Sequence, residues 1–297
     1  MIGQLAALVA AFLWATSSFI YSFVGQKIPP LQLNFLKGII AIFLILMTFG
    51  IQPPRIGSIA LMPALMLALS GVIGIGLGDT AFFLALNNLG VRKTLLLETV
   101  APPLSAFLGF ILIGEIISPQ LWLGIVLILF GVIWVIWERS ERNLVVEYRI
   151  GLIWVMLAAI SQSLGAVLSR MALLNSEINP LESSLIRLMA GSAIALFLSL
   201  IPIFSADKSL TATIKSLPAR TILIIFLASF GGTYLGIWLQ QISFKYTSIG
   251  IAQTLLATSP LFSLVIALVR KEKVTLRSFL GVTLAIVGIG FLLIGSN

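Results

Sequence analysis

Long runs of apolar residues separated by short polar breaks extend along the whole chain. A helix needs about 20 predominantly apolar residues to cross a bilayer, and ten stretches approach or exceed this length. The breaks hold turn signals such as Pro29-Pro30 and Asn179-Pro180, or charged clusters such as Arg92-Lys93. We therefore expect ten transmembrane helices, at residues 3–25, 31–50, 60–89, 93–114, 119–137, 150–172, 181–201, 218–245, 249–270 and 276–294.

The third and eighth stretches are longer than a bilayer requires, and each has glycines in its middle. Four glycines lie within residues 71–78 and three within residues 231–236. We interpret each stretch as one tilted or kinked helix. If each were two helices, the two halves of the chain would have six helices apiece and would be parallel.

The sequence repeats itself at a distance of 157 residues. The block from Pro103 to Gly131 and the block from Pro260 to Gly288 share seven identical residues over 29 aligned positions without a gap. A period of about half the chain indicates a duplicated unit. We expect two halves, residues 1–138 and 150–297, joined by the charged linker 139–149.

Five helices in each half have a topological consequence. Because five is odd, the second half enters the membrane with inverted orientation. Inverted repeats are typical of secondary transporters, which bind their substrate near the midplane between the repeats.

Composition supports this interpretation. The chain is 59% hydrophobic and 9% charged, whereas a soluble domain has about 25% charged residues. We expect a multi-pass integral protein of the plasma (inner) membrane with the lipid bilayer as its partner. The sequence has no Cys and no His, so thiol chemistry and the commonest metal ligand are excluded. We expect no metal and no cofactor.

The net charge of +8 lies in short loops, so we do not expect a nucleic-acid partner. Of the 18 Lys and Arg residues, 13 lie in the loops after the odd-numbered helices and three on the opposite side. Because basic loops stay in the cytoplasm, this distribution predicts that both termini lie outside.

Several sequence features occur in the same order in both halves. The second helix has a basic residue near its start (Lys37, Arg187), and the fourth has a proline (Pro103, Pro260) and ends at a glutamate (Glu115, Glu272). The fifth helix has the pattern Gly-x6-Gly. A further feature, in the first half alone, is the ending Ala85-Leu86 of the third helix. In these features the chain resembles ten-helix EamA-type members of the drug/metabolite transporter superfamily. The resemblance implies inverted repeats, a central cavity, and export or exchange of small metabolites, often amino acids or drugs.

Four ionisable residues lie inside the expected helices: Lys37, Asp79, Glu98 and Arg187. Such groups are costly in a bilayer and usually face a partner or a wet cavity. Their depths allow a Lys37–Glu98 ion pair with Asp79 deeper, and they place Arg187 on the other side, without an acid to pair it. One interpretation is a structural ion pair and a snorkelling Arg187. The other is that Asp79 or Glu98 takes a proton and Arg187 or Lys37 meets a substrate carboxylate.

Further polar and aromatic residues could line a central cavity. These candidates are Trp14, Gln162, Tyr234, Trp238, Gln240, Gln241 and Gln253. Pro102, Pro103 and Pro260 interrupt helical hydrogen bonding and are candidate kinks or hinges.

An enzymatic function is not expected. Gly76-Leu77-Gly78-Asp79 resembles a motif of intramembrane aspartyl proteases, but that chemistry needs two aspartates sharing a proton, and the other aspartate, Asp207, lies in a polar loop. Ser–His catalysis lacks a histidine, and no phosphate-binding loop is present.

The sequence thus favours a secondary transporter that exports or exchanges small metabolites such as amino acids by alternating access. The alternative is a non-transporting membrane scaffold or receptor subunit. Proton coupling and homo-oligomer formation stay open.

Overall fold

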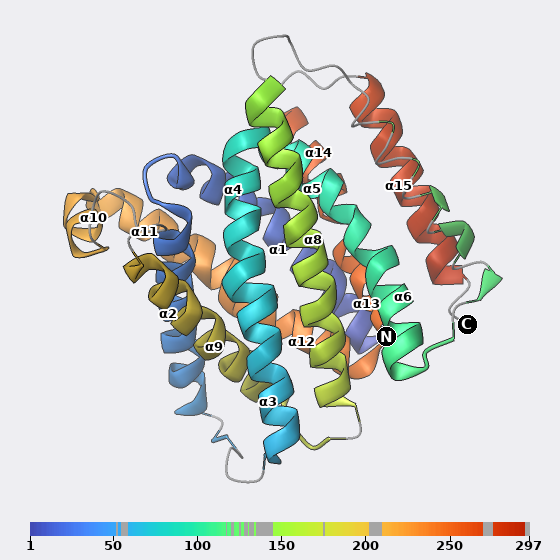
Figure 1. The fold of residues 1–297 in the computed structure, drawn as a ribbon, viewed down its shortest axis with the longest axis horizontal. Helices are drawn as coiled ribbons and strands as arrows, with labels where there is room; N and C mark the ends of the chain where they lie inside the picture. Colours follow the sequence, from blue (N-terminus) through green and yellow to red (C-terminus); the bar gives the residue numbers. More distant parts are fainter. Residues whose placement is uncertain are drawn as a thin grey trace.

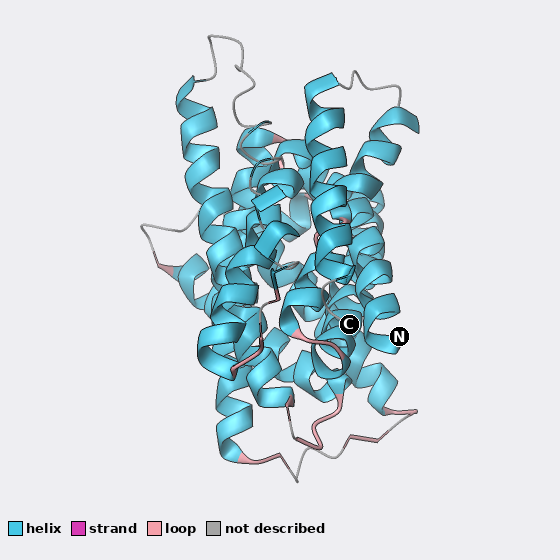
Figure 2. Ribbon diagram, turned by 90° about the vertical axis from the view of Figure 1, so that its right-hand side faces the viewer, coloured by secondary structure: helices cyan, strands magenta, loops and turns pink. Residues whose placement is uncertain are grey.

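The computed structural model describes residues 1–51, 53–54, 59–116, 118–119, 122–124, 126–127, 130, 134, 145–174, 176–201, 210–269 and 276–294. These residues form a bundle of helices packed along one another (Figures 1 and 2), and no strand occurs among them.

The helical segments follow the hydrophobic pattern of the sequence. They are α1 (Ile2–Gly25), α2 (Pro30–Phe49), α3 (Leu61–Ser70), η2 (Gly71–Gly78), α4 (Asp79–Leu89), α5 (Val91–Leu97), η3 (Glu98–Val100), α6 (Ala101–Ile113), α8 (Val145–Leu173), α9 (Pro180–Leu200), α10 (Leu210–Ser216), α11 (Ala219–Ala228), η5 (Ser229–Leu235), α12 (Gly236–Tyr246), α13 (Ile249–Leu256), α14 (Ser259–Val269) and α15 (Leu276–Ile294).

Seven continuous helical stretches in the described residues are long and apolar enough to cross a membrane, and two shorter apolar helices cover 249–263 and 279–288. Most of the expected fifth span, most of the linker, Gly131, Glu272 and Asp207 lie outside the described residues. The count of ten spans therefore stays a prediction.

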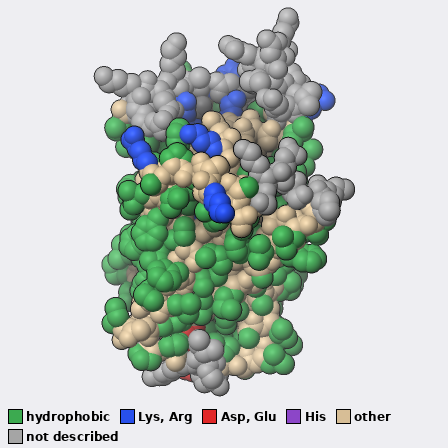
Figure 3. All heavy atoms as spheres, turned by 90° about the vertical axis from the view of Figure 1, so that its left-hand side faces the viewer, with side chains coloured by type: hydrophobic (Ala, Val, Ile, Leu, Met, Phe, Trp, Pro, Cys, Tyr) green, Lys and Arg blue, Asp and Glu red, His purple; other side chains and the backbone are tan. Residues whose placement is uncertain are grey.

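In α1, the side chains that face the interior are mostly small, and those that face the outside include large apolar ones. In α1, alanines and serines such as Ala7, Ala11 and Ser18 are buried, whereas Leu5 and Phe12 are exposed. Small residues let membrane helices approach closely. The face of the molecule in Figure 3 is largely apolar, with Lys and Arg side chains gathered toward one end. We call this end the basic face and the opposite end, where α1 begins, the N-terminal face.

The two long spans are each one continuous helix, as expected from their sequence. Leu61–Leu89 contains the π-helical segment η2 at its centre, and Ala219–Tyr246 contains η5 at the equivalent place. A π-helical turn widens the helix and is common at functional sites. Asp79 is the first residue after η2, and Gly236, which is 157 positions further on, is the first after η5.

The two halves pack on each other through equivalent pairs of elements. The first helix of the first half, α1, contacts η5 and α12, and the first helix of the second half, α8, contacts η2 and α4. In the same way α2 contacts η5 and α9 contacts η2. The long glycine-containing helix of each half is therefore packed against the first two helices of the other half.

The candidate hinge prolines lie at interruptions of the helical backbone. Between α5 and α6 the chain forms the 3-10 turn η3, and Pro102 and Pro103 follow in the first turn of α6. Between α13 and α14 the helix is broken at residues 257–258, and Pro260 is the second residue of α14. Proline fits the first turn of a helix because its missing N–H has no partner there anyway.

Candidate functional site

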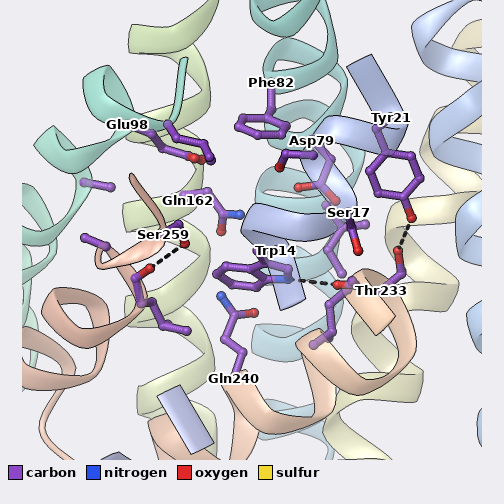
Figure 4. A pocket seen from close by; sticks show the side chains of 18 of the residues that line it. Trp14, Ser17, Tyr21, Asp79, Phe82, Glu98, Gln162, Thr233, Gln240 and Ser259 are labelled. Atoms are coloured by element: carbon purple, nitrogen blue, oxygen red, sulfur yellow. Dashed lines mark hydrogen bonds between the residues drawn. The ribbon is translucent and has the colours of Figure 1, made fainter. Parts of the chain in front are cut away.

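A cavity lies between the two halves of the bundle (Figure 4), with a volume of about 100 Å³. This is room for several water molecules. Eight of the eleven cavity candidates line it, and so do two of the three prolines: Trp14, Lys37, Asp79, Glu98, Gln162, Arg187, Gln240, Gln253, Pro102 and Pro260.

Lys37 pairs with Asp79 and not with Glu98, so the ion pair that the depths allowed is wrong. The Lys37 side chain is 6% exposed and the Asp79 side chain 16%. The ammonium group also lies 5.3 Å from the centre of the Phe83 ring, within range of a cation–π interaction. Both charges of the pair are therefore compensated inside the protein.

Asn34, one turn before Lys37, explains the choice of partner. Its Nδ2 donates to the carbonyl oxygens of Ile75 and Gly76, at 2.8 and 3.1 Å, and lies 2.9 Å from the Thr80 hydroxyl. These contacts hold α2 against η2 and the start of α4, so Lys37 meets Asp79. Depth in the membrane, on which the expected pair rested, does not specify which helices are neighbours.

Arg187 is 1% exposed and lies in the cavity wall, so the snorkelling interpretation is wrong. Its Nη1 donates to Gln240 Oε1 at 2.9 Å, while its Nε has no hydrogen-bond partner among the described residues. No carboxylate of the described residues forms an ion pair with it. An unpaired buried charge is expensive, so this guanidinium is suited to bind an anionic group.

Local sequence brings Arg187 to this position. Pro180 begins α9 behind a capping box, in which Asn179 Oδ1 accepts from the Leu181 N–H and Glu182 accepts from the Asn179 N–H, both at 3.0 Å. A Cβ at Gly71 would lie 2.7 Å from the Arg187 Cα. Only glycine at position 71 allows the backbones of η2 and α9 to approach this closely.

Glu98 differs from Asp79 in having no hydrogen bond and no ion pair among the described residues. It is half-buried, and its position in η3, where the fourth span is interrupted, directs it toward the cavity (Figure 4). The cavity thus holds one compensated ion pair, one free carboxylate and one guanidinium bound only to an amide.

Glutamines and Trp14 complete the polar lining. The Gln162 Oε1 and Gln253 Nε2 atoms are buried without partners in the described residues. Trp14 donates its indole N–H to the Gly232 carbonyl at 2.8 Å. A Cβ at Gly236 would lie 2.6 Å from that nitrogen, so the absence of a side chain there leaves room for the indole.

Four candidates lie away from the cavity lining. The Tyr234 hydroxyl lies 2.7 Å from the Thr48 hydroxyl, and its ring packs on Trp238. Gln241 accepts from the Ser183 hydroxyl at 3.2 Å. Pro103 lies in α6 next to the cavity residue Pro102.

Several lining residues were not expected from the sequence: Ser17, Ser18, Tyr21, Phe82, Phe83, Thr99, Thr233 and Ser259. The Tyr21 hydroxyl lies 3.0 Å from the Thr233 hydroxyl, which joins α1 to η5. The internal repeat of 157 residues could have identified Phe83 as a lining residue from the candidate Gln240. Phe83 and Gln240 are 157 residues apart, and each contacts the basic residue of the preceding second helix, Lys37 or Arg187.

The described residues contain no group of three or more acidic side chains that could hold a metal ion. Gly76 to Asp79 form the end of η2 and the start of α4, and their only aspartate is paired with Lys37.

Comparison with known proteins gives a family and a fold. The EamA-like transporter family profile matches residues 1–137 and 149–294. A solved structure described as "Crystal structure of protein" superposes with a TM-score of 0.77 at 16% identity, covering 99% of this chain and 97% of the other. That likeness concerns the fold alone. No curated protein matches the sequence.

Proposed function

Because the chain belongs to the EamA-like transporter family, we propose that it is a secondary transporter that exports or exchanges small metabolites, with amino acids as the leading class, by alternating access. The family and the apolar helices establish a multi-pass membrane protein and a membrane transporter. We further propose that the protein lies in the plasma (inner) membrane.

The observation that carries the proposal is the buried guanidinium of Arg187 on the central cavity. It is nearly inaccessible, bound to the neutral Gln240, and has an unpaired Nε. Arginine binds carboxylates with planar, charge-assisted hydrogen bonds. A substrate carboxylate would supply the partner that the described residues do not.

Glu98 adds a second requirement on the substrate. Its carboxylate lines the same cavity without a partner among the described residues, so it suits the ammonium group of a zwitterion. The aromatic residues Trp14, Tyr21 and Phe82 give the cavity apolar walls. An amino acid has one group for each of these surfaces, which supports amino acids over purely anionic or purely apolar substrates.

Alternating access needs two units that rearrange around one site. We propose ten helices in two inverted five-helix repeats, residues 1–138 and 150–297. The equivalent contacts of α1 with η5 and α12, and of α8 with η2 and α4, support this arrangement. The interruptions before Pro103 and Pro260 are candidate hinges in equivalent places.

A closed, dry and fully apolar interior between the halves would favour the alternative, a non-transporting scaffold or receptor subunit. A cavity that contains four ionisable side chains and unpaired amides fits transport better. We retain the alternative as an outcome of the experiment.

The test is uptake and counterflow in proteoliposomes with a pool of amino acids and related metabolites, with and without a pH gradient, for wild type and Asp79→Asn. Accumulation above empty liposomes supports transport. Accumulation driven by the gradient and lost in Asp79→Asn protein that is shown to be folded supports proton coupling through Asp79. Movement indifferent to the gradient and to the variant indicates facilitated transport or exchange. If folded wild-type protein moves no member of this pool or of a broader one, the transport proposal fails.

A further inference from the structure

A network of charged hydrogen bonds ties four helix ends together at the N-terminal face. Arg170, in the last turn of α8, donates from Nε to Glu115 Oε1 at 3.1 Å. Its Nη1 donates to the carbonyl oxygens of Phe244 and Lys245, at 2.7 and 2.9 Å. The other carboxylate oxygen of Glu115 accepts from the Ile249 N–H at 2.9 Å. We call the Glu115–Arg170 pair the clasp.

The sequence builds the clasp from groups that helix ends leave unsatisfied. Gly114 follows the last residue of α6 and adopts the left-handed conformation, with φ +79°. The N–H of Glu115 then donates a hydrogen bond to the Gly109 carbonyl oxygen at 3.3 Å. The last carbonyls of α12 and the first N–H of α13 have no partner within their own helices. Arg170 donates to the last carbonyl oxygens of α12, and Glu115 accepts from the first N–H of α13. The pair therefore links α6, α8, α12 and α13.

A layer of buried apolar side chains separates the clasp from the cavity. Phe244 and Ile249 are both 0% exposed and pack in one cluster. Gln240 and Gln253, four residues away on the same helices, line the cavity. Four residues are one helical turn, about 6 Å. On α12 and α13, one layer of buried apolar side chains therefore lies between the cavity and the clasp.

The repeat shows that the basic face is built differently. The counterpart of Phe244, 157 residues earlier, is Asn87, which is exposed, whereas Phe244 is fully buried. The counterpart of Arg170, at the offset of 148 that aligns the first helices, is Ser22, which cannot form an ion pair. The counterpart of Glu115, Glu272, lies outside the described residues.

We propose that the Glu115–Arg170 clasp is a latch of the N-terminal face. While intact it keeps that end of the cavity closed and favours access from the basic face, and it breaks when the cavity opens to the N-terminal face. The proposal rests on alternating access as part of the proposed function. It makes Arg170 and Glu115 positioning residues, because they act through the α12–α13 connection and do not touch the cavity.

The absence of cysteine in the sequence allows a direct test by labelling. Ser18→Cys places a reporter thiol on the cavity wall of α1. Its reaction with a membrane-impermeant thiol reagent is measured from each side in vesicles of known orientation. Ile51→Cys, at the exposed end of α2 on the N-terminal face, and Arg149→Cys, exposed at the basic face, report which side the reagent reaches.

The Ser18→Cys reporter is then combined with Arg170→Gln and, separately, with Glu115→Gln. The matched control is Arg149→Gln, which removes an arginine that is exposed and has no hydrogen bond or ion pair in the described residues. Loss of charge-assisted hydrogen bonds should raise labelling of the reporter thiol from the N-terminal face by about tenfold, and lower it from the basic face. The control variant should label like the parent.

Unchanged sidedness in folded Arg170→Gln and Glu115→Gln proteins would overturn the proposal, even if both melt earlier, because a merely structural tie affects stability alone. If Arg170→Gln does not fold, Glu115→Gln decides, since its amide oxygen can still accept from Ile249. The two proposals fail separately: a change of sidedness without transport of any pool member leaves the latch and removes transport, whereas transport with unchanged sidedness removes the latch.

Discussion

The Lys37–Asp79 pair allows the strongest quantitative prediction. The two side chains are 6% and 16% exposed, so each charge would be stranded if its partner were removed. Removing one member of a buried pair costs about 3–5 kcal/mol, whereas replacing both by neutral groups is often close to neutral. We therefore expect Lys37→Met and Asp79→Asn each to destabilise the protein by about 3 kcal/mol, toward the low end because the Asp79 side chain is 16% exposed.

The double variant Lys37→Met/Asp79→Asn should recover most of this loss. At roughly 2–4 °C per kcal/mol for a large domain, the single variants should melt about 6–12 °C below wild type, and the double variant within a few degrees of it. The assay is thermal unfolding of the purified protein in one detergent, followed by loss of the monodisperse peak in size-exclusion chromatography. A double variant that melts as low as the sum of the single effects would refute the reasoning, because the two charges would then be independent.

Two further predictions use substitutions with a clear structural contrast. Gly71→Ala places a Cβ against the Arg187 backbone, whereas a Cβ at Gly231 would meet nothing closer than 3.6 Å. We expect Gly71→Ala to lower stability by about 1–3 kcal/mol and Gly231→Ala to leave the melting temperature nearly unchanged; equal melting temperatures would contradict the close approach of η2 and α9. Glu98→Gln should leave stability within about 1 kcal/mol, because no ion pair is broken, but should raise the KM for substrates that carry an ammonium group. A loss of stability as large as that of Asp79→Asn, or an unchanged KM for such substrates, would contradict a free Glu98 carboxylate that meets the substrate.

The sequence was most informative where hydrophobicity alone decides the outcome. Apolar length located the helical stretches that the structure describes, and the interpretation of the third and eighth stretches as one long helix each is confirmed. The π-helical segments η2 and η5 could not be foreseen in this way, because apolar length does not report the register of backbone hydrogen bonds.

The site was predicted less evenly. Lys37, Asp79, Glu98 and Arg187, which the sequence singled out as buried charges, all line one cavity, and their role in transport stays a prediction. Their pairing was not predictable from depth, because it depends on Asn34 holding α2 against η2. Residue type misled for Tyr234 and Trp238, since an aromatic ring packs equally well against a neighbouring helix. Because residue type does not distinguish an aromatic ring in a cavity wall from one packed between helices, the sequence also did not identify Tyr21 and Phe83 as lining residues.

The central claim is that the cavity carries a small metabolite whose carboxylate is bound by Arg187. It is tested most directly by counterflow of the transported substrate into proteoliposomes containing wild type or Arg187→Gln, with equal amounts of folded protein. We predict rapid accumulation by wild type, and for Arg187→Gln a loss of about tenfold or more for substrates with a carboxylate. Equal rates of carboxylate transport by the two proteins would contradict the account.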